Sequence, residues 1–380
     1  MSKVYPAIDR LHSWFTGDVL PFWASASWDL EVGGFFECLD LEGAPVRGPR
    51  RVRVQARQVY TFSSVASLGW LPQGEEIAAR GFQAFRLQSC PDDGARGCAH
   101  TLSDDGTITD DRRDLYDQAF LLLACASMIE AGGDKDALAL AENTMAFLDR
   151  ELRSEAGGWF ESDRRETPRR QNPHMHLFEA FMALSRATGA DAWRRHADAV
   201  AALFEERFFN SETGLLREFF TADLAAPDPE HGETIEPGHM MEWVWLLGQY
   251  DELTGADHGA VRRQLFSAAL NFADKETGLL PDTVTPTGSA VRKRLWPQTE
   301  AVRAAFSLSS SPDDDFAHYG ARIIEAIFNF YIAPAKRGLW IDQIDDAGEP
   351  CVESAPASIL YHLFEAVAET QDFARKKRPL

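Results

Sequence analysis

The stretch Gly157–Gly158–Trp159–Phe160–Glu161 decides the fold, because it is nearly a copy of Gly33–Gly34–Phe35–Phe36–Glu37. Similar glycine-led stretches recur along the chain, and each contains one glycine that we call a marker glycine. The six marker glycines are Gly34, Gly97, Gly158, Gly214, Gly278 and Gly338, separated by 56 to 64 residues. Six markers at a period of about 60 residues form an internal repeat, and a repeat of this kind sets the architecture before any single motif is considered.

Between the marker glycines the apolar residues recur at three- and four-residue steps, which predicts amphipathic helices. Each unit is predicted as helix, linker, helix and short extended turn, with no further strands. The predicted helices cover residues 5–26, 55–71, 75–87, 116–131, 136–152, 175–188, 190–208, 240–254, 258–272, 299–308, 316–331 and 358–369.

Six helix pairs at this period predict an all-α fold, an (α/α)6 barrel or toroid with short β-turn extensions. We expect one catalytic domain over residues 1–380. In such a ring the N-termini of the inner helices and the loops before them face one end, where a pocket forms. An open α-solenoid with a concave protein-binding face is the alternative.

The composition excludes several classes of partner. Of the 380 residues, 45% are apolar, which is enough for a large core, and the net charge is −21 with a sequence pI of about 4.9. Nucleic acid and anionic membranes both need a basic surface, so neither is expected as a partner. The same charge disfavours a highly phosphorylated substrate, although one local arginine could overrule it.

The five cysteines are Cys38, Cys90, Cys98, Cys125 and Cys351, and no C-x-x-C occurs. Cys90 and Cys98 flank a glycine-containing loop that does not resemble a zinc site. We expect reduced thiols in a cytoplasmic protein. The first 20 residues do not have the pattern of a signal peptide, and no run of about 18 apolar residues predicts a membrane span.

Two histidine–glutamate pairs stand at the starts of predicted helices. In Ile235–Glu236–Pro237–Gly238–His239–Met240–Met241–Glu242–Trp243 a Pro-Gly turn precedes His239, and Glu242 follows three residues later on the same helix face. An imidazole beside a carboxylate suits proton transfer. His176 and Glu179 repeat the spacing after Asn172. A buried histidine satisfied by hydrogen bonds is the structural alternative for both.

Four other helix starts carry polar or aromatic candidates. Arg57, with Tyr60 one turn further, lies in an otherwise apolar helix and either forms a structural salt bridge or donates to substrate oxygens. At Asp114–Phe120, Asp114 is expected to cap the helix and Tyr116 to face the pocket. Trp296, Gln298 and Glu300 suit a sugar, whose apolar face stacks and whose hydroxyls need polar partners, although capping and core packing are the alternatives. His362 starts the last inner helix. A closed ring would aim Arg57, Tyr116, His176, His239, Trp296 and His362 at one axis.

The sequence lacks the motifs of several other chemistries. It has no nucleotide-binding G-x-x-x-x-G-K-[ST] loop, no strand-based G-x-G-x-x-G, and no G-x-S-x-G elbow. His174 and His176 form H-x-H, but no further ligand cluster and no H-E-x-x-H accompany it, so no metal and no cofactor are expected.

Six short motifs, in order along the chain, resemble those of the N-acylglucosamine 2-epimerase superfamily, especially its mannose isomerase and aldose–ketose isomerase members. They are R-Q-x-Y-x-F at 57–62, Y-D-x-A-F at 116–120, M-H-x-x-E-A at 175–180, P-G-H-x-x-E-W at 237–243, W-P-Q-T-E at 296–300 and Y-H at 361–362. The resemblance implies an (α/α)6 barrel and cofactor-free proton transfer on a free sugar, so we expect a monosaccharide as the partner of a monomer or homodimer. It implies that His239 and His362 are the acid and base, that Glu242 orients His239, and that Arg57 and His176 hold the oxygens of a cis-enediolate.

Two departures from the family pattern bear on substrate choice. Gln118 stands where many relatives have histidine, and Met240 and Met241 replace aromatic or polar residues. The sequence favours an aldose–ketose isomerase of the mannose-to-fructose type and leaves a sugar 2-epimerase as the alternative. A glycoside hydrolase, with Glu242 and Glu300 as its carboxylate pair, or a non-catalytic binding toroid is less favoured.

Overall fold

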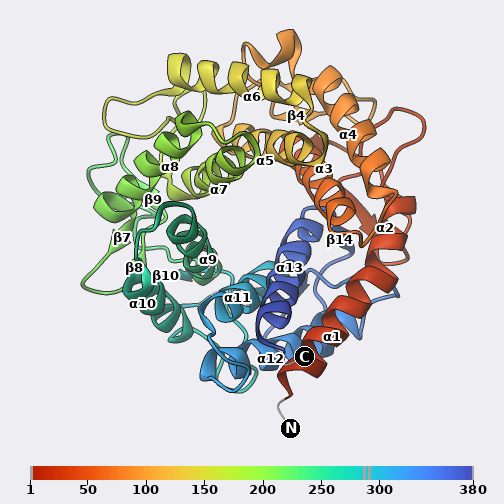
Figure 1. Ribbon diagram of the computed structural model, residues 1–380, viewed down its shortest axis with the longest axis vertical. Coiled ribbons are helices and arrows are strands. Elements are labelled where there is room, and N and C mark those ends of the chain that lie inside the picture. The colour runs from red at the N-terminus through yellow and green to blue at the C-terminus, as the bar shows by residue number, and fades with distance from the viewer. Residues whose placement is uncertain (1–2, 286–287, 290–291, 379–380) are drawn as a thin grey trace.

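The computed structural model describes residues 3–285, 288–289 and 292–378, and it is a closed double ring of helices (Figure 1). The inner ring consists of α3 (Val52–Ser67), α5 (Leu115–Gly132), α7 (Gln171–Thr188), α9 (Pro237–Thr254), α11 (Leu295–Leu308) and α13 (Ile359–Lys377). The outer ring consists of α4 (Gly74–Ser89), α6 (Lys135–Phe147), α8 (Asp191–Leu203), α10 (Gly259–Leu270), α12 (Asp315–Ile327), α1 (Val4–Trp14) and α2 (Leu20–Ala26).

Packing between the first and last helices closes the ring. Helix α13 packs against α3, and α1 packs against both α12 and α13. This closure confirms the predicted (α/α)6 barrel and excludes the open solenoid. Among the described residues, no helix is both long and apolar enough to cross a bilayer.

The two rings differ in how their helices are buried. On α5, residues Asp117 through Ser127 are all buried, because an inner helix is covered by two neighbours and by the outer ring. On the outer α8, buried side chains form one stripe that includes Trp193, Ala197 and Val200. The core therefore lies between the rings and around the inner helices.

Helical turns of the π type end several outer elements. Segment η1 (Phe15–Val19) joins α1 to α2, while η3 (Leu148–Leu152), η4 (Phe204–Phe208) and η5 (Phe328–Ile332) follow α6, α8 and α12. A 3-10 turn, η2 (Pro91–Gly94), follows α4. These segments account for the length of the predicted helices at 136–152, 190–208 and 316–331.

Three inner helices, α7, α9 and α11, begin three or four residues earlier than the sequence pattern predicts. We expected starts at Met175, Met240 and Thr299, whereas the helices begin at Gln171, Pro237 and Leu295. The first turn of each of these three helices contains a proline, and the predicted helix begins after that proline. Proline is tolerated in the first turn because the N–H groups there have no partner inside the helix.

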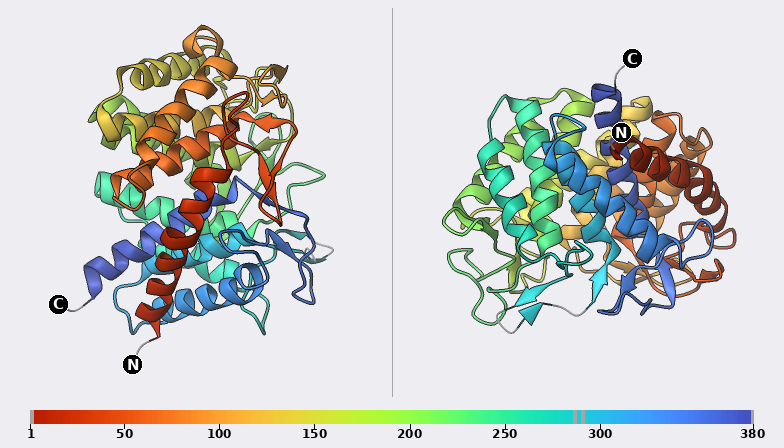
Figure 2. Two further views of the ribbon diagram at one scale, coloured as in Figure 1. Left: turned by 90° about the vertical axis from the view of Figure 1, so that its right-hand side faces the viewer. Right: turned by 90° about the horizontal axis from the view of Figure 1, so that it is seen from below.

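Short antiparallel strands gather at one end of the ring, and the two termini lie at the opposite end (Figure 2). The strand before an inner helix commonly pairs with a loop of a neighbouring unit: Arg50 with Leu102, Arg169 with Phe220, Lys293 with Ile344, and Pro356 with Cys38. The strands are β1 (Cys38–Asp40), β2 (Pro45–Val46), β3 (Arg50–Arg51), β4 (Thr101–Leu102), β5 (Ile108–Asp110), β6 (Arg169–Arg170), β7 (Phe209–Asn210), β8 (Leu215–Leu216), β9 (Phe219–Phe220), β10 (Val284–Thr285), β11 (Gly288–Ser289), β12 (Lys293–Arg294), β13 (Gln343–Ile344) and β14 (Ser354–Pro356).

All six marker glycines have left-handed backbone conformations, with φ between 61° and 88°. Side chains rarely adopt this region, which is why glycine recurs there. At Gly158 a Cβ would also lie 2.4 Å from Nε2 of His174. The repeat read from the sequence is thus a repeated turn that leads into the strand end of the ring.

One prediction about the cysteines is wrong. Cys90 and Cys98 form a disulfide across η2, while Cys38, Cys125 and Cys351 are free. The side chain of Gln118 accepts from the N–H of Cys98 and donates to its carbonyl, at 2.9 Å each, and so fixes the loop that brings the two cysteines together. The spacing of the cysteines gave no indication of this contact between Gln118 and Cys98.

Candidate active site

The strand end of the ring holds a cavity of about 200 Å³ at the axis. All six residues predicted to converge from different inner helices line it: Arg57, Tyr116, His176, His239, Trp296 and His362. Asn172, Glu236, Glu242, Arg51, Arg53, Arg294, Ser358 and Ile359 complete the lining. The repeat therefore delivers one functional side chain from each inner helix to one place.

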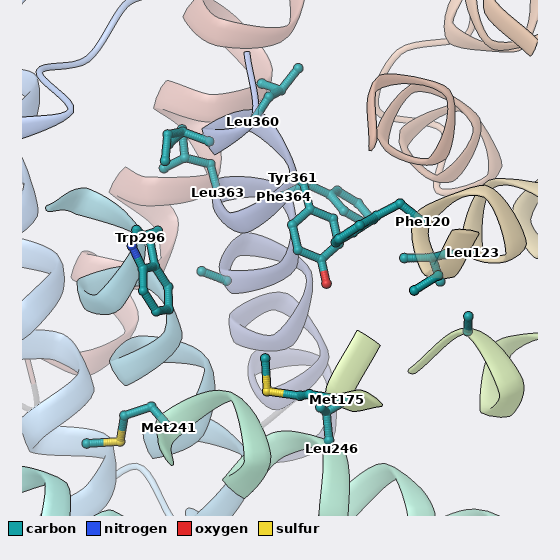
Figure 3. Close-up of a cluster of buried hydrophobic side chains, with 14 of the residues drawn as sticks. Phe120, Leu123, Met175, Met241, Leu246, Trp296, Leu360, Tyr361, Leu363 and Phe364 are labelled. Atoms are coloured by element: carbon teal, nitrogen blue, oxygen red, sulfur yellow. The ribbon is translucent and has the colours of Figure 1, made fainter. Parts of the chain in front are cut away.

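Trp296 contacts both histidines predicted to carry out proton transfer. Its ring centroid is 5.1 Å from that of His239 and 5.6 Å from that of His362. Figure 3 shows Trp296 on α11 and Tyr361 on α13 facing the centre of the ring, with Phe120 of α5 beside Tyr361. A flat apolar group against Trp296 would therefore lie close to both imidazoles.

The partner predicted for His239 is wrong. Nδ1 of His239 hydrogen-bonds Oε2 of Glu218 at 3.0 Å and lies 3.3 Å from a carboxylate oxygen of Glu236. Glu242 shares the cavity with His239 but makes no hydrogen bond to it. The Glu218 carboxylate belongs to the β8–β9 turn, which precedes α9. The three-residue spacing along a helix therefore could not predict this partner.

A repeat-level signal could have identified Glu218. Glu37, Glu161 and Glu218 each follow a marker glycine by three or four residues. The first two hold arginines that precede inner helices, since Glu37 bonds Arg51 and Glu161 bonds Arg170. By analogy Glu218 would be expected to hold a polar group near the start of an inner helix, and that group is His239.

The charges around His239 favour its protonated form. Burial lowers the pKa of His239, but the carboxylates of Glu236 and Glu218 outweigh burial and raise this pKa well above the usual value. On the other side of the imidazole, Nε2 of His239 lies 3.1 Å from the side-chain amide of Asn172. The buried Oδ1 of Asn172 has no partner in the described chain, and a half-turn of the amide would place it to accept from a protonated Nε2.

His362 has the opposite surroundings. Its Nδ1 lies 2.7 Å from Oε1 of Glu300, and in the described chain nothing hydrogen-bonds its Nε2. Burial and then the guanidiniums of Arg57 and Arg303 lower the pKa of His362 well below the usual value. His362 is therefore neutral, with Nδ1–H donated to Glu300 and the lone pair of Nε2 available.

Arg57 is a cation without a counter-ion. Among the described residues it forms no ion pair, and its Nη2 donates to the hydroxyl of Tyr116 at 2.8 Å. Its guanidinium carbon lies 4.1 Å from the ring centroid of Phe120 and 5.1 Å from that of Tyr361. Aromatic faces stabilise the charge without neutralising it, so Arg57 can still attract a negative oxygen. The alternative of a structural salt bridge does not hold in the described chain.

His176 and Glu242 form a third polar group in the cavity. Burial lowers the pKa of His176 to about 4, although Glu179 opposes this shift, and Nδ1 lies 3.3 Å from Oε2 of Glu179. Glu242 lies 3.7 Å from Nδ1 of His176, and neither of its buried carboxylate oxygens has a hydrogen-bond partner in the described chain. Burial, Glu300 and Glu179 raise the pKa of Glu242 well above the usual value, which favours the uncharged acid, a form that can donate.

Four predicted substrate-binding residues lie outside the lining. Glu179 and Glu300 stand behind His176 and His362 and hold their Nδ1 atoms. Tyr60 donates to Glu365 at 2.5 Å, and Gln298 bonds the backbone of Leu280 and Arg294. The helix-start rule found the correct helices but could not distinguish the turn that faces the cavity from the one that faces a neighbour.

The sequence departures also fall outside the cavity. Gln118 is buried and bonds the loop at Cys98, and Met240 and Met241 are fully buried in the core. None of them is part of the cavity lining. A direct effect on substrate choice through these three side chains is therefore not supported.

A second cavity of about 510 Å³ adjoins the first and shares Arg53 and Tyr116 with it. Its arginines are each held by a carboxylate: Arg53 by Asp117 at 3.2 Å, Arg112 by Glu166 at 3.0 Å and Arg170 by Glu161 at 2.6 Å. A substrate longer than one sugar unit has room to extend here.

Three groups of side chains are close enough to bind a metal ion by geometry: His100 with Asp114 and Asp117, His176 with Glu179 and Glu242, and Glu218 with Glu236 and His239. In the last group the carboxylates already hold a histidine in place. The absence of a metal remains a prediction. Asp114 also caps α5, as expected, by accepting from the N–H of Tyr116.

Comparison with known proteins identifies the family. The profile of the N-acylglucosamine 2-epimerase (GlcNAc 2-epimerase) family matches residues 34–366. The chain belongs to this family. Mannose-6-phosphate isomerase of Rhizobium meliloti is 34% identical over 97% of both chains, and D-mannose isomerase of Thermobifida fusca is 26% identical over 87% of both.

Solved structures of the same fold agree with this membership. Cellobiose 2-epimerase from Bacillus thermoamylovorans superposes with a TM-score of 0.87 at 18% identity, covering 96% of this chain and 99% of its own. At that identity the match concerns the fold alone. The N-acylglucosamine 2-epimerase family and these relatives together place the chain among the sugar isomerases and 2-epimerases.

Proposed function

We propose that the protein is a cofactor-independent aldose–ketose isomerase that acts on a free sugar of the mannose-to-fructose type. The observation that carries the proposal is the contact of Trp296 with two imidazoles, His239 and His362, whose surroundings favour opposite protonation states. A sugar stacked on Trp296 would have a base, His362, and an acid, His239, within the same cavity. The mannose isomerases among the relatives support this reaction.

The reaction requires one proton to move between neighbouring carbons of the open-chain sugar. Nε2 of His362 takes the C2 proton, and the electron pair of that bond forms the C1–C2 double bond of an enediolate. The carbonyl oxygen O1 gains the negative charge, which Arg57 stabilises and the His239 imidazolium neutralises by donating a proton. His362 then returns its proton to C1, and the O2 hydroxyl returns one to His239.

The remaining lining residues position the sugar. His176 is neutral, so its Nε2 can accept from a hydroxyl while Nδ1–H is held by Glu179. Glu242 has unused oxygens and, when uncharged, both donates and accepts. The glycoside hydrolase alternative loses support, because Glu300 holds His362 and does not line the cavity as a second carboxylate.

A 2-epimerase is a second candidate on the same observation. A neutral base and a protonated acid that both contact Trp296 could remove the C2 proton from one face of the sugar and return another proton to the opposite face. The cellobiose 2-epimerases among the relatives favour this candidate. The two reactions differ in the carbon that receives the returning proton and in the residue that delivers it: His362 to C1 in the isomerase, and His239 to the opposite face of C2 in the epimerase.

Incubation with mannose in D2O, followed by NMR, separates the candidates. Fructose labelled at C1 indicates the isomerase, and glucose labelled at C2 indicates the epimerase. Mannose 6-phosphate and cellobiose are run in parallel, because relatives carry these names and the second cavity has room for a longer substrate. His362→Asn should abolish turnover, and His318→Asn, on the exposed side of α12, should not. No product and no label from any of the sugars would overturn the proposal.

A further inference from the structure

A buried guanidinium lies beneath the cavity, and the proposed mechanism does not use it. Arg303 on α11 is fully buried. It reaches carboxylates from three inner helices: Glu365 at 2.5 Å, Glu179 at 3.3 Å and Glu300 at 3.4 Å. Its guanidinium carbon lies 3.4 Å from the ring centroid of Trp245. Burying a charged group is costly unless it is paired, and Arg303 is paired three times.

Two of these carboxylates connect Arg303 to histidines of the cavity. Glu300 uses Oε2 for Arg303 and Oε1 for Nδ1 of His362. Glu179 uses Oε1 for Arg303 and Oε2 for Nδ1 of His176. Each carboxylate thus bridges the same guanidinium to a different imidazole. Glu365 completes the set and binds Tyr60 instead of a histidine.

Arg303 opposes a strong tendency of this cluster to take up protons. Burial raises the pKa of Glu300, and Arg303 is the main group that lowers it again. Burial likewise raises the pKa of Glu365 to about 7 against the same arginine. An ionised carboxylate can only accept a hydrogen bond, which places the hydrogen on Nδ1, whereas a protonated carboxyl can instead donate to Nδ1. The charge of Arg303 therefore bears on which nitrogen of His362 carries hydrogen.

We propose that Arg303 is a positioning residue for the isomerisation, acting through Glu300 and Glu179 to keep His362 and His176 protonated on Nδ1 with Nε2 open toward the substrate. The inference rests on the proposed function for its kinetic part only. Without the cation, Glu300 takes up a proton and donates it to Nδ1. The imidazole then carries hydrogen on Nε2 and has no lone pair for the C2 proton.

Loss of Arg303 also changes the charge that His362 experiences. Arg303 is one of the cations that hold the pKa of His362 down, so its removal raises this pKa, and the acidic limb of kcat/KM moves to higher pH. The charged groups around His362 are Glu300 and Arg303 from α11, Arg57 from α3, Glu179 from α7 and Arg294 from the strand before α11. In Arg303→Met the charges of Arg57, Glu179 and Arg294 remain, so the shift reports Arg303 together with the protonation of Glu300 that it controls.

The test compares Arg303→Met, Arg303→Lys and the exposed control Arg322→Met on α12. For Arg303→Met we expect kcat to fall about 100-fold, within the range that general acid–base catalysis supplies, and the acidic limb to move upward by about one pH unit. Arg303→Lys should restore the position of the limb, and Arg322→Met should match the wild type. If Arg303→Met folds and loses activity with an unmoved pH profile, its role is structural and the proposal is wrong.

Two further measurements keep the inference testable if Arg303→Met does not fold, or if the proposed function is wrong. Glu300→Gln breaks the bridge between Arg303 and His362 without removing the cation, and should lower kcat as strongly, whereas Glu365→Gln should not. 15N NMR of labelled histidine, with His362→Asn for assignment, reports the tautomer without any substrate. Nδ1 protonation in the wild type and its loss in Glu300→Gln support the inference even if mannose is not turned over. An unchanged tautomer in Glu300→Gln overturns it.

Discussion

The carboxylate of Glu218 lies 3.0 Å from Nδ1 of His239, across 21 residues of chain and from outside the helix that carries the histidine. The helix neighbour expected in this role, Glu242, instead lies 3.7 Å from His176. This relationship determines which substitution should disturb the acid of the proposed reaction.

Glu218→Gln should lower kcat by more than about 10-fold, as loss of an orienting partner typically does. Since Glu218 is one of the carboxylates that raise the pKa of His239, the basic limb of kcat/KM should move to lower pH. Glu242 comes after Glu236 and Glu218 among the carboxylates that raise this pKa, so Glu242→Gln should move the limb less. The pH profiles of both variants, with exposed Glu233→Gln as control, check this. A basic limb that moves in Glu242→Gln but not in Glu218→Gln would contradict the assignment.

Arg57→Met should reduce kcat by about 100- to 1,000-fold, the typical effect of removing a donor to a developing oxyanion. Its guanidinium lacks a counter-ion in the described chain, so its charge is available to the enediolate. Tyr116→Phe removes one neighbour of Arg57 and should cost only a few-fold. Steady-state kinetics distinguish the roles, with exposed Arg80→Met as control. A rise in KM at unchanged kcat would assign Arg57 to ground-state binding instead.

Gln298→Leu should destabilise the fold and leave substrate binding alone. Gln298 makes three hydrogen bonds to the backbone at Leu280 and Arg294, and their loss should cost about 2–4 kcal/mol. We expect a lower Tm in thermal unfolding, a KM within about two-fold of the wild type, and no change in Tm for exposed Gln83→Leu. A stable variant with a large increase in KM would restore Gln298 to the substrate site.

His174 should make the protein sensitive to acid. Burial lowers its pKa to about 3 in the folded state, and both ring nitrogens are bonded, Nε2 accepting from the N–H of Trp159 and Nδ1 donating to the carbonyl of Arg170. Between pH 6.5 and about 3 the unfolded chain binds a proton that the folded chain does not. The free energy of unfolding therefore decreases as the pH is lowered through this range. The contribution is fully present above pH 6.5, and about 2 kcal/mol of it is lost at pH 5.

Urea unfolding of His174→Asn at pH 7 and pH 5 checks this. The variant should be less stable at pH 7 but lose less stability on acidification than the wild type. His231→Asn, on the surface, should follow the wild type. Equal pH dependence in His174→Asn and the wild type would show that His174 does not carry the effect.

Most of the fold was predictable because its two signals are periodic. Marker glycines at about 60 residues and apolar residues at helical steps identified six helix pairs, and closure followed from their number. The cavity lining was predictable for the same reason. Each inner helix carries one lining residue near its start: Arg57, Tyr116, His176, His239, Trp296 and His362. The residues behind the cavity lining were not predictable, because Glu218 and Arg303 act through contacts between different elements. The Cys90–Cys98 disulfide spans only eight residues, but the geometry of its loop left no signal in the cysteine spacing.

The carboxylate that follows a marker glycine has consequences for how such a protein can evolve. At Glu37 and Glu161 it anchors an arginine, and at Glu218 the equivalent position holds a histidine. Duplicated units can diverge at this position one at a time while the others keep the ring closed. New specificity is therefore best sought by exchanging the short segments before the inner helices, leaving the helices themselves unchanged.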